Sequence, residues 1–144
     1  MIEQDTIRLL RECDAGVKMG ASSIHDVLQY VKSEELRRLL SDCRDAHDRL
    51  DGEIQGLLDR FGDEGKEQGP VVRKMAEMET KMKLAMHPGD ETVAELMTDG
   101  CNMGVKSLSQ YLNRYKAADE ASKGAARRLI ALEADLASDI RGFL

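Results

Sequence analysis

Residues 13–20 read CDAGVKMG and residues 101–108 read CNMGVKSL, so the pattern C-x-x-G-V-K occurs twice in a chain of 144 residues. The two copies begin at Cys13 and Cys101, which lie 88 residues apart. A second pair of similar stretches, RRLL at 37–40 and RRLI at 127–130, is separated by 90 residues. Two matches at nearly the same offset indicate that the segment 3–61 recurs, in diverged form, as the segment 91–142.

The first segment has the pattern of two antiparallel helices. Region 3–31 carries apolar residues at alternating spacings of three and four, which is typical of a helix in a bundle. This first seam consists of Leu10, Cys13, Val17, Gly20, Ile24, Val27 and Val31. After a short link, Ser33 is suited to cap a second helix over 34–61. Its seam consists of Leu36, Leu40, Cys43, His47, Leu50, Ile54, Leu57 and Phe61.

The second segment predicts another hairpin, with helices over 91–117 and 119–142 and with Asp90 as an N-cap. Between the hairpins, Pro70 suits the first turn of a further helix over 70–87. A helix of this length spans roughly 25 Å, enough to carry the chain from one end of a bundle to the other. Its apolar stripe consists of Val71, Met75, Met78, Met82 and Met86. This stripe predicts packing in the core or against a partner, including an oligomer contact.

Composition narrows the class of protein. Two Phe, three Tyr and no Trp leave little material for strands and favour an all-α chain. The net charge of −6 argues against nucleic-acid binding. No apolar run approaches the length of a membrane span, and the charged N-terminus does not read as a secretory signal. Three cysteines without metal or disulfide spacing fit a reducing, cytoplasmic setting. We expect a single domain over residues 1–144.

The stretch 31–62, VKSEELRRLLSDCRDAHDRLDGEIQGLLDRFG, resembles the second helix of proteins in the ferritin-like superfamily. The shared pattern is a short link, then E-L-x-x-L-L, then a helix ending L-L-x-x-F-G. The similarity is to small bacterial members of unknown or stress-related function. It implies a ferritin-like antiparallel four-helix bundle of two repeated hairpins, 3–61 and 91–142, with an extra crossover helix at 70–87.

Metal-binding members of that superfamily carry a Glu on each of two helices and a Glu-x-x-His on each of the other two. Carried over to this chain, the pattern falls on Asp14, on His47-x-x-Leu50, and on Asn102. The last motif falls on Asp135-x-x-Ser138 or on Ala137-x-x-Ile140. No Glu-x-x-His is present, so the resemblance implies a degenerate di-metal site. The candidate metal ligands are Asp14, His47, Asn102 and Asp135, with Cys43 beside His47.

Three functions follow from these residues. The leading one is a non-enzymatic cytoplasmic protein without a cofactor, which acts through self-assembly as a dimer or larger oligomer, or through a protein partner. The second is a metal-binding or small-ligand protein that holds iron, manganese or zinc near Asp14 and His47. The third is a thiol-based redox sensor that uses Cys13, Cys43 and Cys101.

Each candidate residue also has a structural interpretation. His47 reads as a buried neutral histidine bonded to Asp14 or to a backbone carbonyl. The cysteines read as small apolar core residues. Four glycines lie inside predicted helices at four-residue spacing, and each costs roughly 1 kcal/mol relative to Ala. These are Gly16, Gly20, Gly100 and Gly104. They indicate either close approach of two helices or room for a ligand between the hairpins.

Overall fold

The computed structural model describes residues 2–67 and 69–144, and these contain five α-helices and no strand. The helices are α1 (Ile2–Leu28), α2 (Glu34–Asp59), α3 (Pro70–Met86), α4 (Asp90–Arg114) and α5 (Glu120–Asp139), followed by a short 3-10 turn, η1 (Arg141–Phe143). The predicted all-α class and the five helices are therefore confirmed. Predicted helix ends differ from the observed ones by up to three residues.

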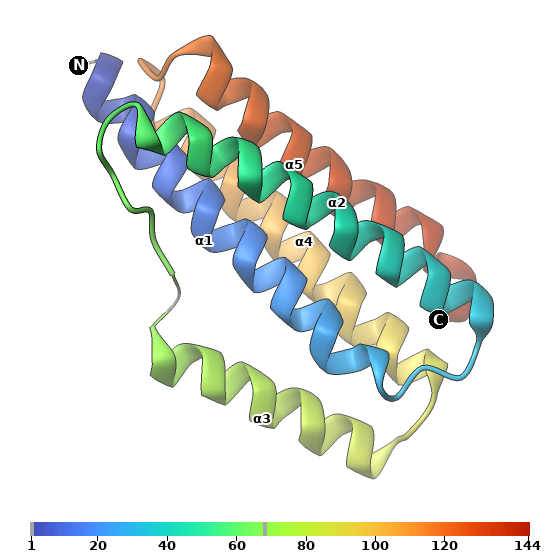
Figure 1. Cartoon of the computed structure of the whole chain (residues 1–144). Helices are drawn as coiled ribbons and strands as arrows, with labels where there is room; N and C mark the ends of the chain where they lie inside the picture. Colours follow the sequence, from blue (N-terminus) through green and yellow to red (C-terminus); the bar gives the residue numbers. More distant parts are fainter. Residues whose placement is uncertain (1, 68) are drawn as a thin grey trace.

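Four of the helices form an antiparallel bundle, and the fifth lies beside it. Helix α1 pairs with α2 and α4 pairs with α5, and the two hairpins meet through α1 against α4 and α2 against α5. Figure 1 shows α3 running alongside this body, set apart from it, and returning the chain to the end where α4 begins. Among the described residues, no helix combines the length and the apolar composition that a membrane span needs.

The first helix ends at Leu28, three residues earlier than predicted, and carbonyl groups at and just beyond its end accept hydrogen bonds from α2. The Arg37 guanidinium donates to the Leu28 carbonyl at 3.4 Å and to the Val31 carbonyl at 2.7 Å. Ser33 caps α2 as predicted, since its hydroxyl accepts a hydrogen bond from the Leu36 N–H at 3.2 Å.

Asp90 does not cap α4, contrary to the prediction. It is the first residue of the helix, and its carboxylate accepts hydrogen bonds from the backbone N–H groups of Lys32 (2.8 Å) and Ser33 (3.0 Å). Asp90 thus fastens the start of the second hairpin to the turn of the first.

The core consists of two apolar clusters, one toward each end of the bundle. One cluster is centred on Leu9, Leu10, Val17, Leu50, Ile54, Leu58, Leu108 and Leu129. The other is centred on Ile24, Val27, Leu36, Leu40, Val93, Met97, Leu136 and Ile140. Each of the four bundle helices contributes residues to both clusters, and a short stretch near the middle of each helix separates these two sets of residues. That stretch holds the candidate site.

Helix α3 contributes little to the core. Its buried face carries Leu84, which is 1% exposed, while Ala76 and Thr80 are half-buried. The methionine stripe faces the other way, and its side chains are 61% to 71% exposed. Packing of the stripe in the core is therefore a wrong prediction. Of the α3 residues, Leu84 packs into the core instead.

Candidate functional site

A polar layer crosses the middle of the bundle, with one residue from each bundle helix. On α1 it is Gly20, between Val17 and Ile24 of the two apolar clusters, and on α4 it is Gly104, between Cys101 and Leu108. On α2 it is His47, between Leu40 and Leu50, and on α5 it is Glu133, between Leu129 and Leu136. We call these four residues the central layer.

His47 and Glu133 form a buried ion pair within the central layer. His47 Nε2 lies 3.2 Å from Glu133 Oε1, and the two side chains are 1% and 10% exposed. His47 Nδ1 lies 2.8 Å from the backbone carbonyl oxygen of Cys43. Because a carboxylate and a carbonyl both accept, both ring nitrogens donate, and the ring is an imidazolium.

The charge on His47 follows from its partners. Burial lowers the pKa of His47, but hydrogen bonds to Cys43 and Glu133 outweigh burial and raise that pKa to about 10. The expectation of a neutral histidine is therefore wrong. The backbone-carbonyl partner that was one of the two predicted options is confirmed, and the carboxylate partner is Glu133 rather than Asp14.

The two glycines of the central layer make room for the ion pair. A Cβ atom on Gly20 would lie 2.7 Å from His47 Nε2, and a Cβ on Gly104 would lie 3.3 Å from Glu133 Cδ. Gly16 has only ordinary contacts at 3.6 Å, and Gly100 has no neighbour within 4 Å. The space that Gly20 and Gly104 leave is filled by the side chains of His47 and Glu133.

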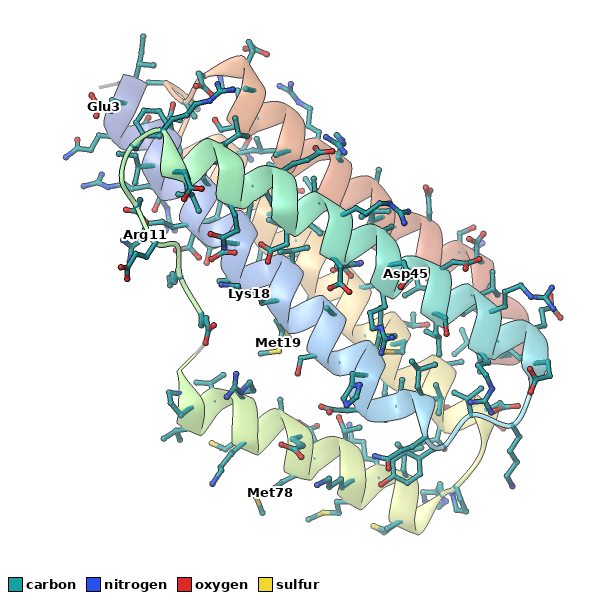
Figure 2. The ribbon with its side chains drawn as sticks, viewed as in Figure 1. Glu3, Arg11, Lys18, Met19, Asp45 and Met78 are labelled. Atoms are coloured by element: carbon teal, nitrogen blue, oxygen red, sulfur yellow. The ribbon has the colours of Figure 1, made fainter. Side chains whose placement is uncertain are left out.

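Asp14 lies in a separate polar cluster, nearer the end of α2. Its carboxylate accepts hydrogen bonds from Gln55 Nε2 (2.7 Å), the Lys66 backbone N–H (2.9 Å) and Lys18 Nζ (3.1 Å). Asp14 is fully buried, whereas Lys18 is one-third exposed. Figure 2 shows Lys18 on α1, at the side of the bundle that faces the segment leading to α3. Asp14 thus joins α1, α2 and the α2–α3 loop.

Asp51 completes this carboxyl cluster. Its Oδ1 atom is buried and has no hydrogen-bond partner among the described residues. Burial, with Asp14 close by, raises the pKa of Asp51 to about 7. Burial also raises the pKa of Asp14, but hydrogen bonds from Asp51, Lys66 and Lys18 outweigh it and hold that pKa below its usual value. Of these two neighbouring carboxyl groups, Asp51 is therefore the one whose ionised form is disfavoured.

The loop between α2 and α3 passes directly over Asp14. Gly65 has a φ of +92°, and a Cβ atom there would overlap the Asp14 carboxylate. The Gly65 N–H donates to Asp63 Oδ1 at 2.8 Å, which fixes the local turn. The loop therefore needs glycine at this position both for its backbone conformation and for its close approach to α1.

The three cysteines are free, and two of them are poor nucleophiles. Burial, with Glu12 and Asp14 nearby, raises the pKa of Cys13 to about 12. Burial and the neighbouring Glu133 raise the pKa of the Cys101 thiol well above its usual value. Cys43 is half-buried, and its Sγ lies 3.5 Å from His47 Nδ1. A cluster of three reactive thiols does not fit these surroundings.

The structure does not bring the four candidate ligands together. Asn102 and Asp135 are exposed on the outside of the bundle, and Asp14 and His47 belong to different polar clusters. Within the described ranges, no group of three or more His, Cys, Asp or Glu residues is arranged to hold a metal ion. Sequence reasoning missed Glu133, Asp51 and Gln55, which are the partners that His47 and Asp14 use.

Known proteins add nothing to this description: no family model, no curated protein and no solved structure matches the chain.

The central layer has little capacity for chemistry. Both ring nitrogens of His47 are engaged, and the histidine and its carboxylate partner neutralise each other. A surface groove of ≈ 270 Å³ between α1, the loop and α3 is lined by Lys18, Met19, Ser22, Glu67 and Arg73. His47 and Glu133 do not line this groove, and their contact joins α2 to α5.

Proposed function

We propose that this protein is a non-enzymatic, cytoplasmic member of the ferritin-like group that acts through self-assembly and has no di-iron centre. The connectivity supports the group: a hairpin, a long crossover helix, and a second hairpin antiparallel to the first. Three free cysteines support a reducing compartment.

The residues of the central layer support the loss of metal chemistry. A di-iron centre of this type requires carboxylates from all four helices and two histidines, all at one depth. Here α1 and α4 supply Gly20 and Gly104 at that depth, and α2 and α5 supply one histidine and one carboxylate already bonded to each other. A hard metal ion would find one free carboxylate oxygen at most.

The observation that carries self-assembly is the exposed apolar face of α3. Six of its residues are each more than half exposed: Val71, Val72, Met75, Met78, Met82 and Met86. Monomeric proteins seldom leave a contiguous apolar patch of this kind in water. Covering it is favourable by roughly 25 cal/mol for each Å² of apolar surface removed from water. Methionine is also adaptable in contacts, which suits a binding surface.

Two measurements on the wild-type protein test the proposal. Sedimentation equilibrium from about 5 µM to about 500 µM should show reversible self-association, whereas a monomer throughout that range would contradict it. Elemental mass spectrometry on protein purified without chelator, and again after incubation with iron, manganese and zinc, should show no stoichiometric metal. Metal that binds in the wild type and not in a His47→Ala variant would favour the metal-binding alternative.

A further inference from the structure

The exposed face of α3 has the spacing of a helix-pairing seam. Val71, Met75, Met78 and Met82 follow one another at intervals of four, three and four, the spacing at which two helices interlock side chains. All four side chains are 61% to 71% exposed. Figure 2 shows Met78 on the side of α3 that points away from the four-helix body.

The charged residues beside the seam are mostly paired within α3. Lys81 lies 2.9 Å from Glu77, and Lys83 lies 3.0 Å from Glu79. The exposed face of α3 therefore does not select for a partner surface that is strongly positive or strongly negative. The net charge of −6 on the whole chain also disfavours an anionic lipid surface. A second copy of α3 matches this surface, because it presents an apolar seam flanked by charges of both signs.

We propose that α3 pairs side by side, in parallel, with α3 of a second copy of this chain, around a twofold axis that runs along the helix. The inference rests on the proposed self-assembly and assigns its surface. In a parallel pair, Lys74 on one flank faces Glu79 of the second copy, which lies five residues further along on the opposite flank. The twofold axis makes this contact occur twice.

The antiparallel alternative places like charges together. Reversing one helix brings the same flanks face to face, so that Lys74 meets Lys81 of the second copy. In the other antiparallel register, with Met78 packed against Met82, Glu79 instead meets Glu79 of the second copy. Like charges facing each other across a helix pair are destabilising, so the flanks select the parallel orientation.

The geometry of the fold permits the pairing and limits its strength. The inner side of α3 rests on α1 and α4, so the two four-helix bodies lie on opposite sides of the helix pair. A helix of 17 residues is about 25 Å long and about 10 Å wide, so one helix pair falls at or below the low end of interface sizes. We expect a dissociation constant in the micromolar range, on the order of 10–100 µM.

Cysteine cross-linking distinguishes the two orientations. Met75→Cys and Met82→Cys variants are prepared separately and oxidised with copper phenanthroline, each alone and then as a mixture. In a parallel pair, residue 75 meets residue 75 and residue 82 meets residue 82, so each variant alone forms a disulfide-linked dimer. The wild-type protein is the control for the native thiols, of which Cys13 and Cys101 are buried.

Each outcome has a defined meaning. Cross-linking in the mixture but not in either variant alone indicates an antiparallel pair and overturns the proposal. A triple variant, Met75→Gln, Met78→Gln and Met82→Gln, should weaken self-association at least tenfold, while Met103→Gln, on the similarly exposed Met103 of α4, should not. If the triple variant still dimerises like the wild type and no cross-link forms, self-assembly stands but uses another surface. A monomeric wild type overturns both proposals.

Discussion

Gly20 illustrates how one absent side chain determines a whole layer of the bundle. With no Cβ, it lets the His47 ring lie against α1, where it reaches Glu133. Gly16 and Gly104 are the glycines that the sequence repeat relates, yet only Gly104 contacts the ion pair closely. The glycines that matter for packing are thus Gly20 and Gly104, one from each hairpin but not equivalent in the repeat.

A comparison of two alanine variants tests this role. Gly20→Ala should destabilise the protein by about 1–3 kcal/mol, because the new Cβ would force His47 or α1 to shift. Gly100→Ala should instead stabilise it by about 0.5–1 kcal/mol, since Gly100 is exposed in a helix with open space around it. Urea unfolding measures both values. A loss of stability in Gly100→Ala equal to that in Gly20→Ala would contradict the packing argument.

The imidazolium of His47 predicts a pH dependence of stability. Its pKa is raised to about 10 in the folded protein, so its contribution is complete below the unfolded pKa of about 6.5. As the pH rises through this window the contribution is lost, at about 1.4 kcal/mol per pH unit. Urea unfolding between about pH 7.5 and pH 8.5 should show this slope, because Asp51 titrates below that range and the thiols of Cys13 and Cys101 ionise in the unfolded chain mainly above it.

The matching variant is His47→Gln. It should be less stable at pH 7.5 and should lose most of the slope. If the slope is the same in the variant and the wild type, the charge on His47 is not its source.

Glu133 shows why the site was only partly predictable from sequence. The apolar residues of the last helix suggest a seam through Leu129, Leu132 and Leu136, and a charged residue is naturally placed outside it. In the structure Leu132 is only half-buried, and Glu133 takes the inner position. The four-three-four spacing of residues 129, 133, 136 and 140, which is that of a helix seam, could have revealed this. The charge concealed it, because its partner lies 86 residues away.

At the scale of elements, the α2–α3 loop is held down by one carboxylate. Asp14 receives the Lys66 N–H, and Gly65 lies against the same carboxylate. The loop sequence GDEGKEQG reads only as a polar connection, and no local pattern indicates that it returns to α1. The helices follow from the spacing of their own residues, whereas this contact depends on groups 52 positions apart.

Substitution of Gly65 should free this loop. Gly65→Ala places a Cβ where the Asp14 carboxylate lies and strains a backbone with φ of +92°. Hydrogen exchange of the Lys66 amide should become at least about tenfold faster, equivalent to about 1.4 kcal/mol of lost protection. Gly69→Ala is the matched control, because its Cβ would meet nothing within 4 Å and its φ is −56°. Equal acceleration in both variants would mean that Asp14 does not hold the loop.

At the scale of the whole molecule, charge opposes the association that α3 favours. Each copy carries a net charge of −6, so two copies repel each other at low ionic strength. Raising the salt concentration from about 50 mM to about 500 mM shortens the screening length and should tighten the dimer a few-fold. Sedimentation equilibrium at both concentrations measures the change. A dimer that weakens with salt would indicate that ion pairs between the helices, rather than the apolar seam, dominate its stability.

The ion pair of the central layer has a further consequence for a chain made of two similar halves. Since the two hairpins are similar, a competing arrangement packs one hairpin against the same hairpin of another molecule, which gives domain-swapped assemblies. By the repeat offset of 90 residues, the counterpart of Glu133 in the first hairpin is Cys43, and the counterpart of His47 in the second is Ala137. A pairing of identical hairpins would therefore leave either a cation or an anion buried alone, which costs several kcal/mol. Because His47 lies in the first hairpin and Glu133 in the second, the ion pair forms only when a first hairpin packs against a second hairpin. It therefore favours the correct pairing of the two halves over the pairing of identical halves.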